Sequence, residues 1–231
     1  MEGKFMIPEI TESELAFIRA CKPENEMEFL RKMEIYGEFL YQTNATMNLT
    51  RIPEEEFWTK HICDSLALAL RYEMPRDGRH LKMCDVGCGA GLPSLVLAAA
   101  FPGLYVTAVD SRGKKVNFVA DAAGKMGLSN LRAIHGRSNE LARQGDFRHA
   151  FRLVTARAVG SAETLIREAS GLISGNGALV LYRTPAQAEP EAEWLKSLKK
   201  PYPFELTETL ELPGDHGETG TRLFLVIRGL S

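Results

Sequence analysis

Residues 81–93 read Leu-Lys-Met-Cys-Asp-Val-Gly-Cys-Gly-Ala-Gly-Leu-Pro, and this stretch decides the fold. Its first half, Leu81–Val86, is a short apolar run of the kind that forms a buried strand. The three glycines that follow let the backbone turn tightly and approach a ligand closely, and Pro93 suits the first turn of a helix. A glycine loop at the carboxyl end of a strand is typical of cofactor sites in open α/β sheets.

Short apolar runs and helical periods alternate downstream of this loop. Four further strands are predicted at 104–109, 131–135, 153–156 and 178–182. Helices are predicted between the strands at 93–101, 114–126, 138–143 and 162–173. Strands that alternate with helices predict a mostly parallel sheet that is covered on both faces.

The last part of the chain has a different pattern. Residues 204–212 and 222–227 both have the character of strands, and no long helix lies between them. We therefore expect them to form an antiparallel pair at the edge of the sheet. The polar residues 185–193 are interpreted as a short connection.

Helical patterns fill the N-terminal third of the chain. Apolar residues recur at three- and four-residue spacings over 11–43, where Pro23 is expected to separate two helices. A further amphipathic helix is predicted over 54–71. We expect residues 1–75 to form a helical extension on the substrate side of an α/β core at residues 76–231.

Composition fits a single soluble domain with such an extension. The chain has 231 residues, of which 45% are hydrophobic and 25% charged. Its start is acidic and lacks the apolar stretch of a secretory signal, and the longest apolar run, Leu92–Phe101, is too short to span a bilayer. We expect a cytoplasmic protein with no membrane partner. The four cysteines have neither a paired Cys-x-x-Cys framework nor a His-rich partner segment, which indicates reduced thiols and no metal site.

Positive charge is concentrated in one part of the chain. Residues 112–157 contain ten Lys or Arg and three acids, so this window carries +7 and the remainder −9 of the net −2. A basic face that binds a polyanion is one interpretation. The other is that these charges lie on several solvated helix faces, and the sequence leaves both open.

Acidic residues at two strand ends favour one cofactor class. The loop has the spacing GxGxG, and Asp85 beside it would repel the pyrophosphate of a dinucleotide but suits the cationic amino-acid end of S-adenosylmethionine. Asp110 closes the second strand, where a carboxylate can accept hydrogen bonds from two ribose hydroxyls. Its alternative role is to cap the next helix. An NAD-dependent oxidoreductase is the least favoured enzyme class.

The third strand leads into Gly136-Arg137-Ser138-Asn139, where backbone groups and the Asn139 amide can meet an adenine. Ser138 as a helix cap is the alternative. These features predict an α/β protein, a Rossmann-like class I S-adenosylmethionine-dependent methyltransferase. Its sheet would be mostly parallel, with an antiparallel C-terminal edge and N-terminal helices.

The segment after the fourth strand bears on the methyl acceptor. Residues 155–159 lack the Asp/Asn-Pro-Pro-aromatic signature of adenine amine methylation, and no Pro-Cys follows for covalent attack on a pyrimidine. Guanine N7 has an in-plane lone pair, so it can attack a sulfonium methyl without prior deprotonation. Arg157 can hold a guanine edge or a phosphate; a surface salt bridge is its alternative role.

Several short motifs together resemble the RsmG family, also called GidB, the bacterial small-subunit ribosomal RNA guanine-N7 methyltransferases. The resemblance covers most of residues 36–183. It rests on Asn48-Leu49-Thr50, His61-Ile62-Cys63-Asp64-Ser65-Leu66, the loop Asp85–Pro93, Val109-Asp110-Ser111 with Lys114-Lys115, Gly136-Arg137 and Arg157-Ala158. The Asn-Leu-Thr and His-x-x-Asp-Ser elements are the specific ones, because methyltransferases in general lack them.

The resemblance implies a cofactor site and a substrate side. It gives a substrate-facing role to Asn48, His61 and Asp64, although His61 and Asp64 can equally be an ordinary hydrogen-bonded pair or cap. Arg157 and Arg183 complete the residues that we expect on the catalytic side. With the loop residues, the expected cofactor site comprises Asp85, Gly87, Gly89, Gly91, Leu92, Asp110, Ser111, Ser138, Asn139 and Arg157.

The chain departs from the family pattern at three places. Asn139 replaces an acid, Ser94 replaces a glycine after Pro93, and Tyr182-Arg183-Thr184 replaces a Lys-Gly pair, so Arg183 offers a planar fork where an ammonium is usual.

The leading hypothesis is methyl transfer from S-adenosylmethionine to guanine N7 of 16S ribosomal RNA, free or in the small ribosomal subunit, by a monomer. Methylation of another RNA position or a small molecule, and a non-catalytic RNA-binding assembly factor, are the alternatives.

Overall fold

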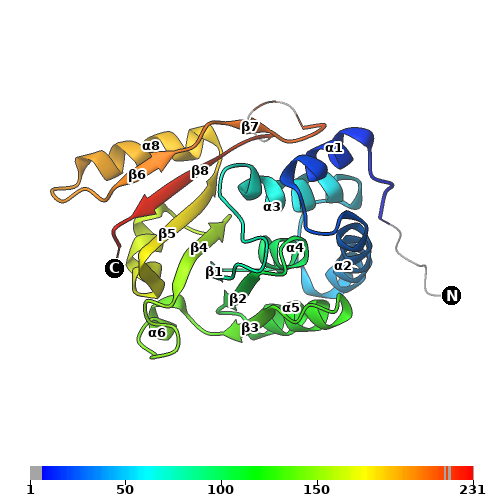
Figure 1. Cartoon of the computed structure of the whole chain (residues 1–231), viewed down its shortest axis with the longest axis horizontal. Helices are drawn as coiled ribbons and strands as arrows, with labels where there is room; N and C mark the ends of the chain where they lie inside the picture. The colour runs from blue at the N-terminus through cyan, green and yellow to red at the C-terminus, as the bar shows by residue number, and fades with distance from the viewer. Residues whose placement is uncertain (1–6, 216, 218–219, 231) are drawn as a thin grey trace.

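A mixed eight-stranded sheet crosses the whole molecule in the computed structural model, which describes residues 7–215, 217 and 220–230 (Figure 1). Its strands are β1 (Leu81–Val86), β2 (Leu104–Asp110), β3 (Leu131–His135), β4 (Phe151–Arg157), β5 (Ile173–Arg183), β6 (Phe204–Leu206), β7 (Leu210–Glu211) and β8 (Thr221–Arg228). They follow the order β3-β2-β1-β4-β5-β8-β6, and β7 also pairs with β8. The five strands predicted downstream of Arg79 are confirmed, two of them to the residue.

Strand direction also follows the prediction. The pairs β1–β2, β2–β3, β1–β4 and β4–β5 are parallel, whereas β8 is antiparallel to both β5 and β6. The antiparallel edge is therefore confirmed, with the predicted strand 204–212 divided into β6 and β7. The chain continues from β1 to β2 on one side of β1 and later returns to β4 on the other side of β1. The sheet therefore has a topological switch point at the carboxyl end of β1. Open α/β sheets bind ligands at such points.

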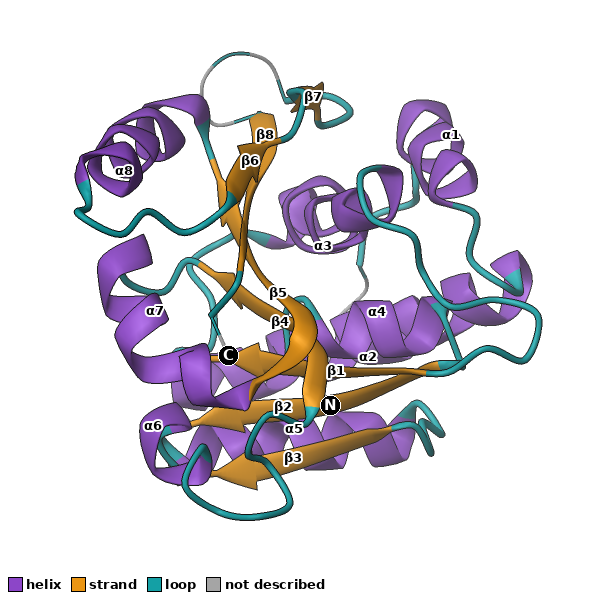
Figure 2. Ribbon diagram, turned by 60° about the vertical axis from the view of Figure 1, so that its left-hand side comes forward, coloured by secondary structure: helices purple, strands orange, loops and turns teal. Residues whose placement is uncertain are grey.

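Helices cover both faces of the sheet (Figure 2). They are α1 (Glu12–Cys21), α2 (Glu26–Met47), α3 (Asp64–Leu66), α4 (Ser94–Ala100), α5 (Gly113–Lys125), α6 (Ser138–Leu141), α7 (Ala162–Ala169) and α8 (Pro185–Ser197). The first hydrophobic cluster contains α2, α4 and α5, and the second contains α6, α7 and α8. Each cluster buries one face of the sheet, as expected for strands that are apolar on both sides.

The N-terminal helices share the core of the first face. Ile18 of α1 and Phe29 and Leu40 of α2 are fully buried in the same cluster as Val106 and Val180 of the sheet. The two predicted helices do end and begin around Pro23. Residues 7–75 are thus held against the sheet by continuous apolar packing. Residues 1–6 of the expected extension lie outside the described residues.

The helix predicted over 54–71 is wrong as a single amphipathic α-helix. The segment is a 3₁₀ turn (Glu54–Glu56), a π-helix (Phe57–Cys63), α3 and a second 3₁₀ turn (Ala67–Leu70). Six of the seven π-helical residues are buried, so the segment is packed on all sides rather than along one stripe. Such wide turns are rare and occur frequently at functional sites.

The connection predicted at 185–193 is also wrong, because α8 occupies it. Pro185 stands at the start of this helix, and Thr184 and Gln187 form a capping box. Ala188, Ala192 and Leu195 form its buried stripe.

A buried ion pair fastens α8 to the sheet. Arg183 at the end of β5 is only 3% exposed, and its guanidinium donates to both carboxylate oxygens of Glu191, at 2.8 and 3.2 Å. Its other donors reach the carbonyl oxygens of Gly160 and Tyr182. Glu191 also accepts from the backbone N–H of Ala162 at the start of α7.

We predict that Glu191→Ala lowers the free energy of unfolding by about 3 to 5 kcal/mol, because it leaves the Arg183 charge buried without a partner. In a chain of this length the melting temperature would fall by about 10 °C. Thermal and urea unfolding measure both quantities. Glu193→Ala is the matched control, since it breaks an exposed pair with Lys196 on the same helix and should leave stability unchanged. Equal stability of the two variants would contradict the prediction.

Candidate functional site

A cleft of about 910 Å³ opens at the carboxyl ends of β1, β2, β3 and β4. Residues from both parts of the chain line it, since Leu49, Thr50 and His61 stand opposite the glycine loop. The cleft therefore lies at the switch point of the sheet, between the N-terminal helices and the strands.

Three glycines shape the loop beneath the cleft. Gly87, Gly89 and Gly91 all have positive φ angles, of 73°, 56° and 87°. A Cβ atom on Gly87 would lie 2.6 Å from Val159, and one on Gly91 would lie 2.4 Å from Leu95. Gly87, Gly89 and Leu92 line the cleft, whereas Gly91 is needed for the close approach of the loop to α4.

Asp85 lies beneath the loop and is 1% exposed. The Thr155 hydroxyl donates to its carboxylate at 3.0 Å, and the Ser94 hydroxyl donates to its other oxygen. Burial raises the pKa of Asp85 to about 6, although these two hydrogen bonds and the charge of Arg157 lower it. The carboxylate does not itself line the cleft, so any effect on a bound cation is exerted from under the loop.

Asp110 ends β2 at the wall of the cleft. One carboxylate oxygen accepts from the backbone N–H of Gly89 at 3.0 Å, and the other accepts from that of Arg112 at 2.9 Å. These contacts join the ends of β1 and β2 and leave further lone pairs on both oxygens. Asp110 is not the cap of α5, whose N-cap position is Arg112.

The other expected cofactor residues stand at the ends of β2 and β3. Ser111, Ser138 and Asn139 line the cleft beside Gly136. Arg137 is the N-cap residue of α6, and no side-chain cap hydrogen bond is present, so the capping alternative for Ser138 is wrong.

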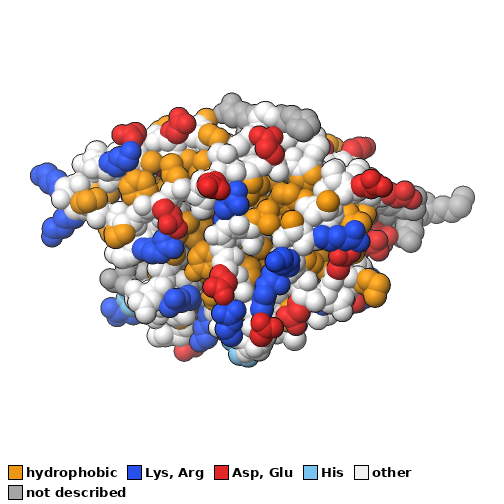
Figure 3. All heavy atoms as spheres, turned by 45° about the horizontal axis from the view of Figure 1, so that its top comes forward, with side chains coloured by type: hydrophobic (Ala, Val, Ile, Leu, Met, Phe, Trp, Pro, Cys, Tyr) orange, Lys and Arg blue, Asp and Glu red, His pale blue; other side chains and the backbone are white. Residues whose placement is uncertain are grey.

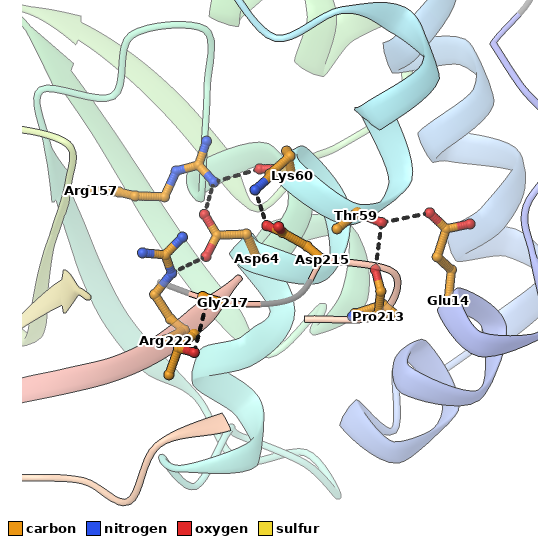
Figure 4. A network of polar contacts seen from close by, with 10 residues as sticks. Glu14, Thr59, Lys60, Asp64, Arg157, Pro213, Asp215, Gly217 and Arg222 are labelled. Atoms are coloured by element: carbon orange, nitrogen blue, oxygen red, sulfur yellow. Dashed lines mark hydrogen bonds and ion pairs between the residues drawn. The ribbon is translucent and has the colours of Figure 1, made fainter. Parts of the chain in front are cut away.

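A carboxylate that bridges two arginines forms the opposite wall (Figure 4). Asp64, 5% exposed, accepts from Nη1 of Arg157 and from Nε of Arg222, both at 2.6 Å. Nη1 of Arg157 also donates to the carbonyl oxygen of Lys60. All three side chains line the cleft. Two guanidinium groups on one carboxylate leave this wall positively charged.

His61 stands beside this bridge and is 2% exposed. Its Nε2 and the Thr50 hydroxyl share a hydrogen bond of 3.1 Å, and its Nδ1 is a buried atom without a partner. Burial, together with the charge of Arg157, lowers the pKa of His61 to about 3. The imidazole is therefore neutral at physiological pH, and one of its nitrogens is buried without a hydrogen-bond partner.

Two residues expected on the catalytic side do not line the cleft. Asn48 is exposed and ends α2 with a φ of 50°. The Asn44 side chain holds the next two residues instead, since it accepts from the N–H groups of Leu49 and Thr50. Arg183 is buried in its pair with Glu191, so the expectation that it faces a substrate is wrong in this structure.

The sequence analysis missed several basic residues of the cleft. Six cations line it, namely Lys60, Arg112, Lys115, Arg137, Arg157 and Arg222, against the acids Asp64, Asp110 and Glu168. Four of these cations belong to the basic window at 112–157. Other members of the window lie over aromatic rings, Lys125 over Phe39 and Arg132 over Phe147. On the face in Figure 3, basic side chains are mixed with acidic ones. The window thus supplies four cations to the cleft, while other members of it lie elsewhere on the molecule.

The lining suits S-adenosylmethionine better than a dinucleotide. The backbone is open at Gly89, where a Cβ atom would meet only Lys115 Nζ and Gly87 O, at 3.8 and 3.9 Å. Asp85 supplies negative charge at one end, and Asp110 can bind ribose hydroxyls at the other.

The described ranges, residues 7–215, 217 and 220–230, contain neither a candidate metal centre nor a candidate membrane span. No three His, Cys, Asp or Glu side chains there gather as metal ligands would, and all four cysteines are buried thiols. None of the helices in these ranges has both the length and the apolar character that a bilayer crossing requires.

Known proteins resemble the chain over most of its length. The sequence model of the GidB family, described as rRNA small subunit methyltransferase G, matches residues 29–213. The ribosomal RNA small subunit methyltransferase G of Lactobacillus delbrueckii is 37% identical over 83% of this chain and 79% of its own length. The methyltransferase G of Geobacillus kaustophilus is 35% identical over 82% of this chain and 79% of its own length.

Solved structures share the fold at low sequence identity. A SAM-dependent O-methyltransferase from Thermotoga maritima has a TM-score of 0.52 and is 17% identical, over 82% of this chain and 71% of its own. A predicted O-methyltransferase from Agrobacterium tumefaciens also has a TM-score of 0.52. It is 19% identical, over 68% of this chain and 77% of its own. The class I methyltransferase fold is thereby confirmed.

We predict that affinity for S-adenosylmethionine falls as the pH is lowered through about 6. The raised pKa of Asp85 means that its carboxylate is charged above this pH and neutral below it, so attraction to the ligand ammonium is lost on acidification. Calorimetry between pH 5 and 8 measures the change. In Asp85→Asn, affinity should be low and should lack this transition. A wild-type affinity that is constant across the range would contradict the role of Asp85.

Proposed function

This chain belongs to the rRNA small subunit methyltransferase G family, and on that premise we propose that it transfers a methyl group from S-adenosylmethionine to N7 of a guanosine in 16S ribosomal RNA. The observation that carries the proposal is the cleft itself. Its glycine-loop side suits the cofactor, and its opposite wall presents the paired guanidinium groups of Arg157 and Arg222.

The cofactor is held by the loops that follow the first three strands. Gly87, Gly89 and Leu92 would supply the floor of this site, Asp110 and Ser111 would bind the ribose, and Ser138 and Asn139 would meet the adenine. Asp85 lies beneath the loop, and its negative charge would stabilise the ammonium group at the amino-acid end of the cofactor. When bound, the cofactor supplies an electrophilic methyl group on a positively charged sulfur.

Arg157 positions the base. Guanine O6 accepts hydrogen bonds, and N7 must keep its lone pair free for attack, so the guanidinium binds O6 rather than N7. Asp64 and the carbonyl oxygen of Lys60 fix the Nη1 end of Arg157, which leaves the remaining N–H groups for the substrate. Catalysis then depends on orientation, because neutral guanine needs no proton removed before N7 attacks.

His61 acts as a neutral positioning group. Its pKa of about 3 excludes an imidazolium at physiological pH, so it takes no part as a general acid. The hydrogen bond that its Nε2 shares with the Thr50 hydroxyl fixes the ring at the wall of the cleft.

The N-terminal residues to about 75 form the substrate side, since they contribute Thr50, His61 and Asp64 to the cleft. The enzyme works as a monomer in the cytoplasm, where 16S ribosomal RNA or the small ribosomal subunit is its partner. Residues of one chain supply both walls of the cleft, which supports the monomer.

Cells that lack the gene should lose one N7-methylguanosine from 16S ribosomal RNA. Aniline cleaves RNA at this base after reduction, so primer extension stops there in wild-type RNA and reads through in the deletion strain. A plasmid copy of the gene should restore the stop. Unchanged methylation in the deletion strain would reject the assignment, and transfer of labelled methyl to another RNA position or to a metabolite would redirect it.

Arg157→Lys should lower kcat/KM for ribosomal RNA by about 100-fold, because an ammonium keeps the charge but loses the planar fork that orients the base. Methyl transfer from labelled cofactor measures the rate. Arg152→Lys is the control, since Arg152 is exposed on the same strand and does not line the cleft. Equal rates for the two variants would remove Arg157 from the mechanism.

A further inference from the structure

A second hollow, of about 420 Å³, adjoins the cleft. It is lined by α6, the turn that follows it, the end of α7 and Gly171. We call it the α6–α7 hollow and define it by Asn139, Ala142, Arg143, Arg148, His149, Arg167, Glu168 and Gly171. Asn139 and Glu168 line both the hollow and the cleft, so the two are neighbours on one surface.

The charge of the α6–α7 hollow is strongly positive. Three arginines line it against one acid, Glu168. Arg143 and Arg148 are exposed and form no ion pair or side-chain hydrogen bond with the residues that the structure describes. Arg167 makes only a 4.0 Å contact with Glu168, and both side chains are largely exposed. Three guanidinium groups that share a single carboxylate repel one another and favour a further anion between them.

The base of the α6–α7 hollow is rigid. His149 has a φ of 50°, its N–H donates to Gly171 O at 2.8 Å, and its Nδ1 lies 2.9 Å from the carbonyl oxygen of Ile173. A Cβ atom on Gly171 would lie 2.9 Å from that of Ala142, so the two segments pack closely there. The buried ring of Phe147 anchors the same turn. The arginines therefore extend from a fixed surface rather than from a loose loop.

We propose that the α6–α7 hollow binds backbone phosphates of the substrate RNA where the strand leaves the cleft. The inference rests on the proposed function and adds a second place of contact to it. The exposed, unpaired guanidinium groups match phosphodiester oxygens, which Arg binds through parallel hydrogen bonds. A strand whose target guanine enters the cleft can continue past Glu168, which lines both the cleft and the hollow, onto this surface.

Contacts of this kind affect binding rather than chemistry. Each phosphate neutralised on a single strand contributes about −0.7 to the slope of log affinity against log salt concentration. Arg143→Gln/Arg148→Gln should therefore weaken binding of transcribed 16S ribosomal RNA about tenfold near 0.1 M salt and flatten the slope by about 0.7 for each lost contact. KM for the RNA should rise, with kcat and affinity for S-adenosylmethionine unchanged.

Two further variants make the test specific. Lys199→Gln/Lys200→Gln removes the same charge from exposed residues that line neither the cleft nor the hollow, so RNA affinity and its salt slope should stay as in the wild type. Glu168→Gln removes the one acid of the α6–α7 hollow and should tighten RNA binding, a gain that misfolding cannot produce. Filter binding across a salt series measures all three.

The outcomes separate this inference from the proposed function. If the wild type methylates guanine N7 while Arg143→Gln/Arg148→Gln binds RNA with wild-type affinity and slope, the hollow plays no part and the proposed function stands. If the two double variants weaken binding equally, the effect is one of overall charge and the inference is overturned. A wild-type enzyme that methylates no guanine N7 would overturn the proposed function instead, whatever the variants bind.

Discussion

The Asp64 carboxylate is the point at which the N-terminal helices, the centre of the sheet and its last strand meet. It lies on α3, directly after the π-helical turn, and accepts from Arg157 of β4 and Arg222 of β8, both at 2.6 Å. A carboxylate that is 5% exposed is tolerated only with such partners. The bridge therefore holds the substrate wall of the cleft in one geometry, and it uses only part of each guanidinium.

The two sides of the cleft are stabilised differently. Asp85 is buried under the glycine loop, where the Ser94 and Thr155 hydroxyls partly offset its desolvation. Ser94 is also a departure from the resembled family, which usually has glycine there. The departure thus adds a hydrogen bond to the acid on the cofactor side. The substrate side relies instead on excess positive charge, which suits an RNA ligand.

The local residue pattern was enough to predict the strands of the sheet. It was not enough to predict the π-helix, α8 or the position of Arg222. The strands 81–86 and 131–135 are short apolar runs bounded by polar or turn residues, so their limits could be read directly. The π-helix could not be read, because a segment buried on every side lacks the one-sided stripe of an amphipathic helix. In α8 the buried stripe is short and Pro190 and several acids interrupt it, which gave the segment the character of a loop. Arg222 was missed because only the antiparallel pairing of β8 with β5 brings it to the cleft, and no local signal encodes that pairing.

The two sides of one strand explain why Arg183 was misplaced. Side chains alternate along β5, so Tyr182 and Arg183 must point to opposite faces. Tyr182 stands opposite Arg157 in the parallel register, lines the cleft and donates from its hydroxyl to the carbonyl oxygen of Ser65. Arg183 then faces α8 and pairs with Glu191. Where the resembled family has a Lys-Gly pair, this chain thus places an aromatic support beneath the Asp64 bridge and an ion pair behind it. The departure changes what holds the cleft wall in place, while Arg157 and Arg222 remain the guanidinium groups of that wall.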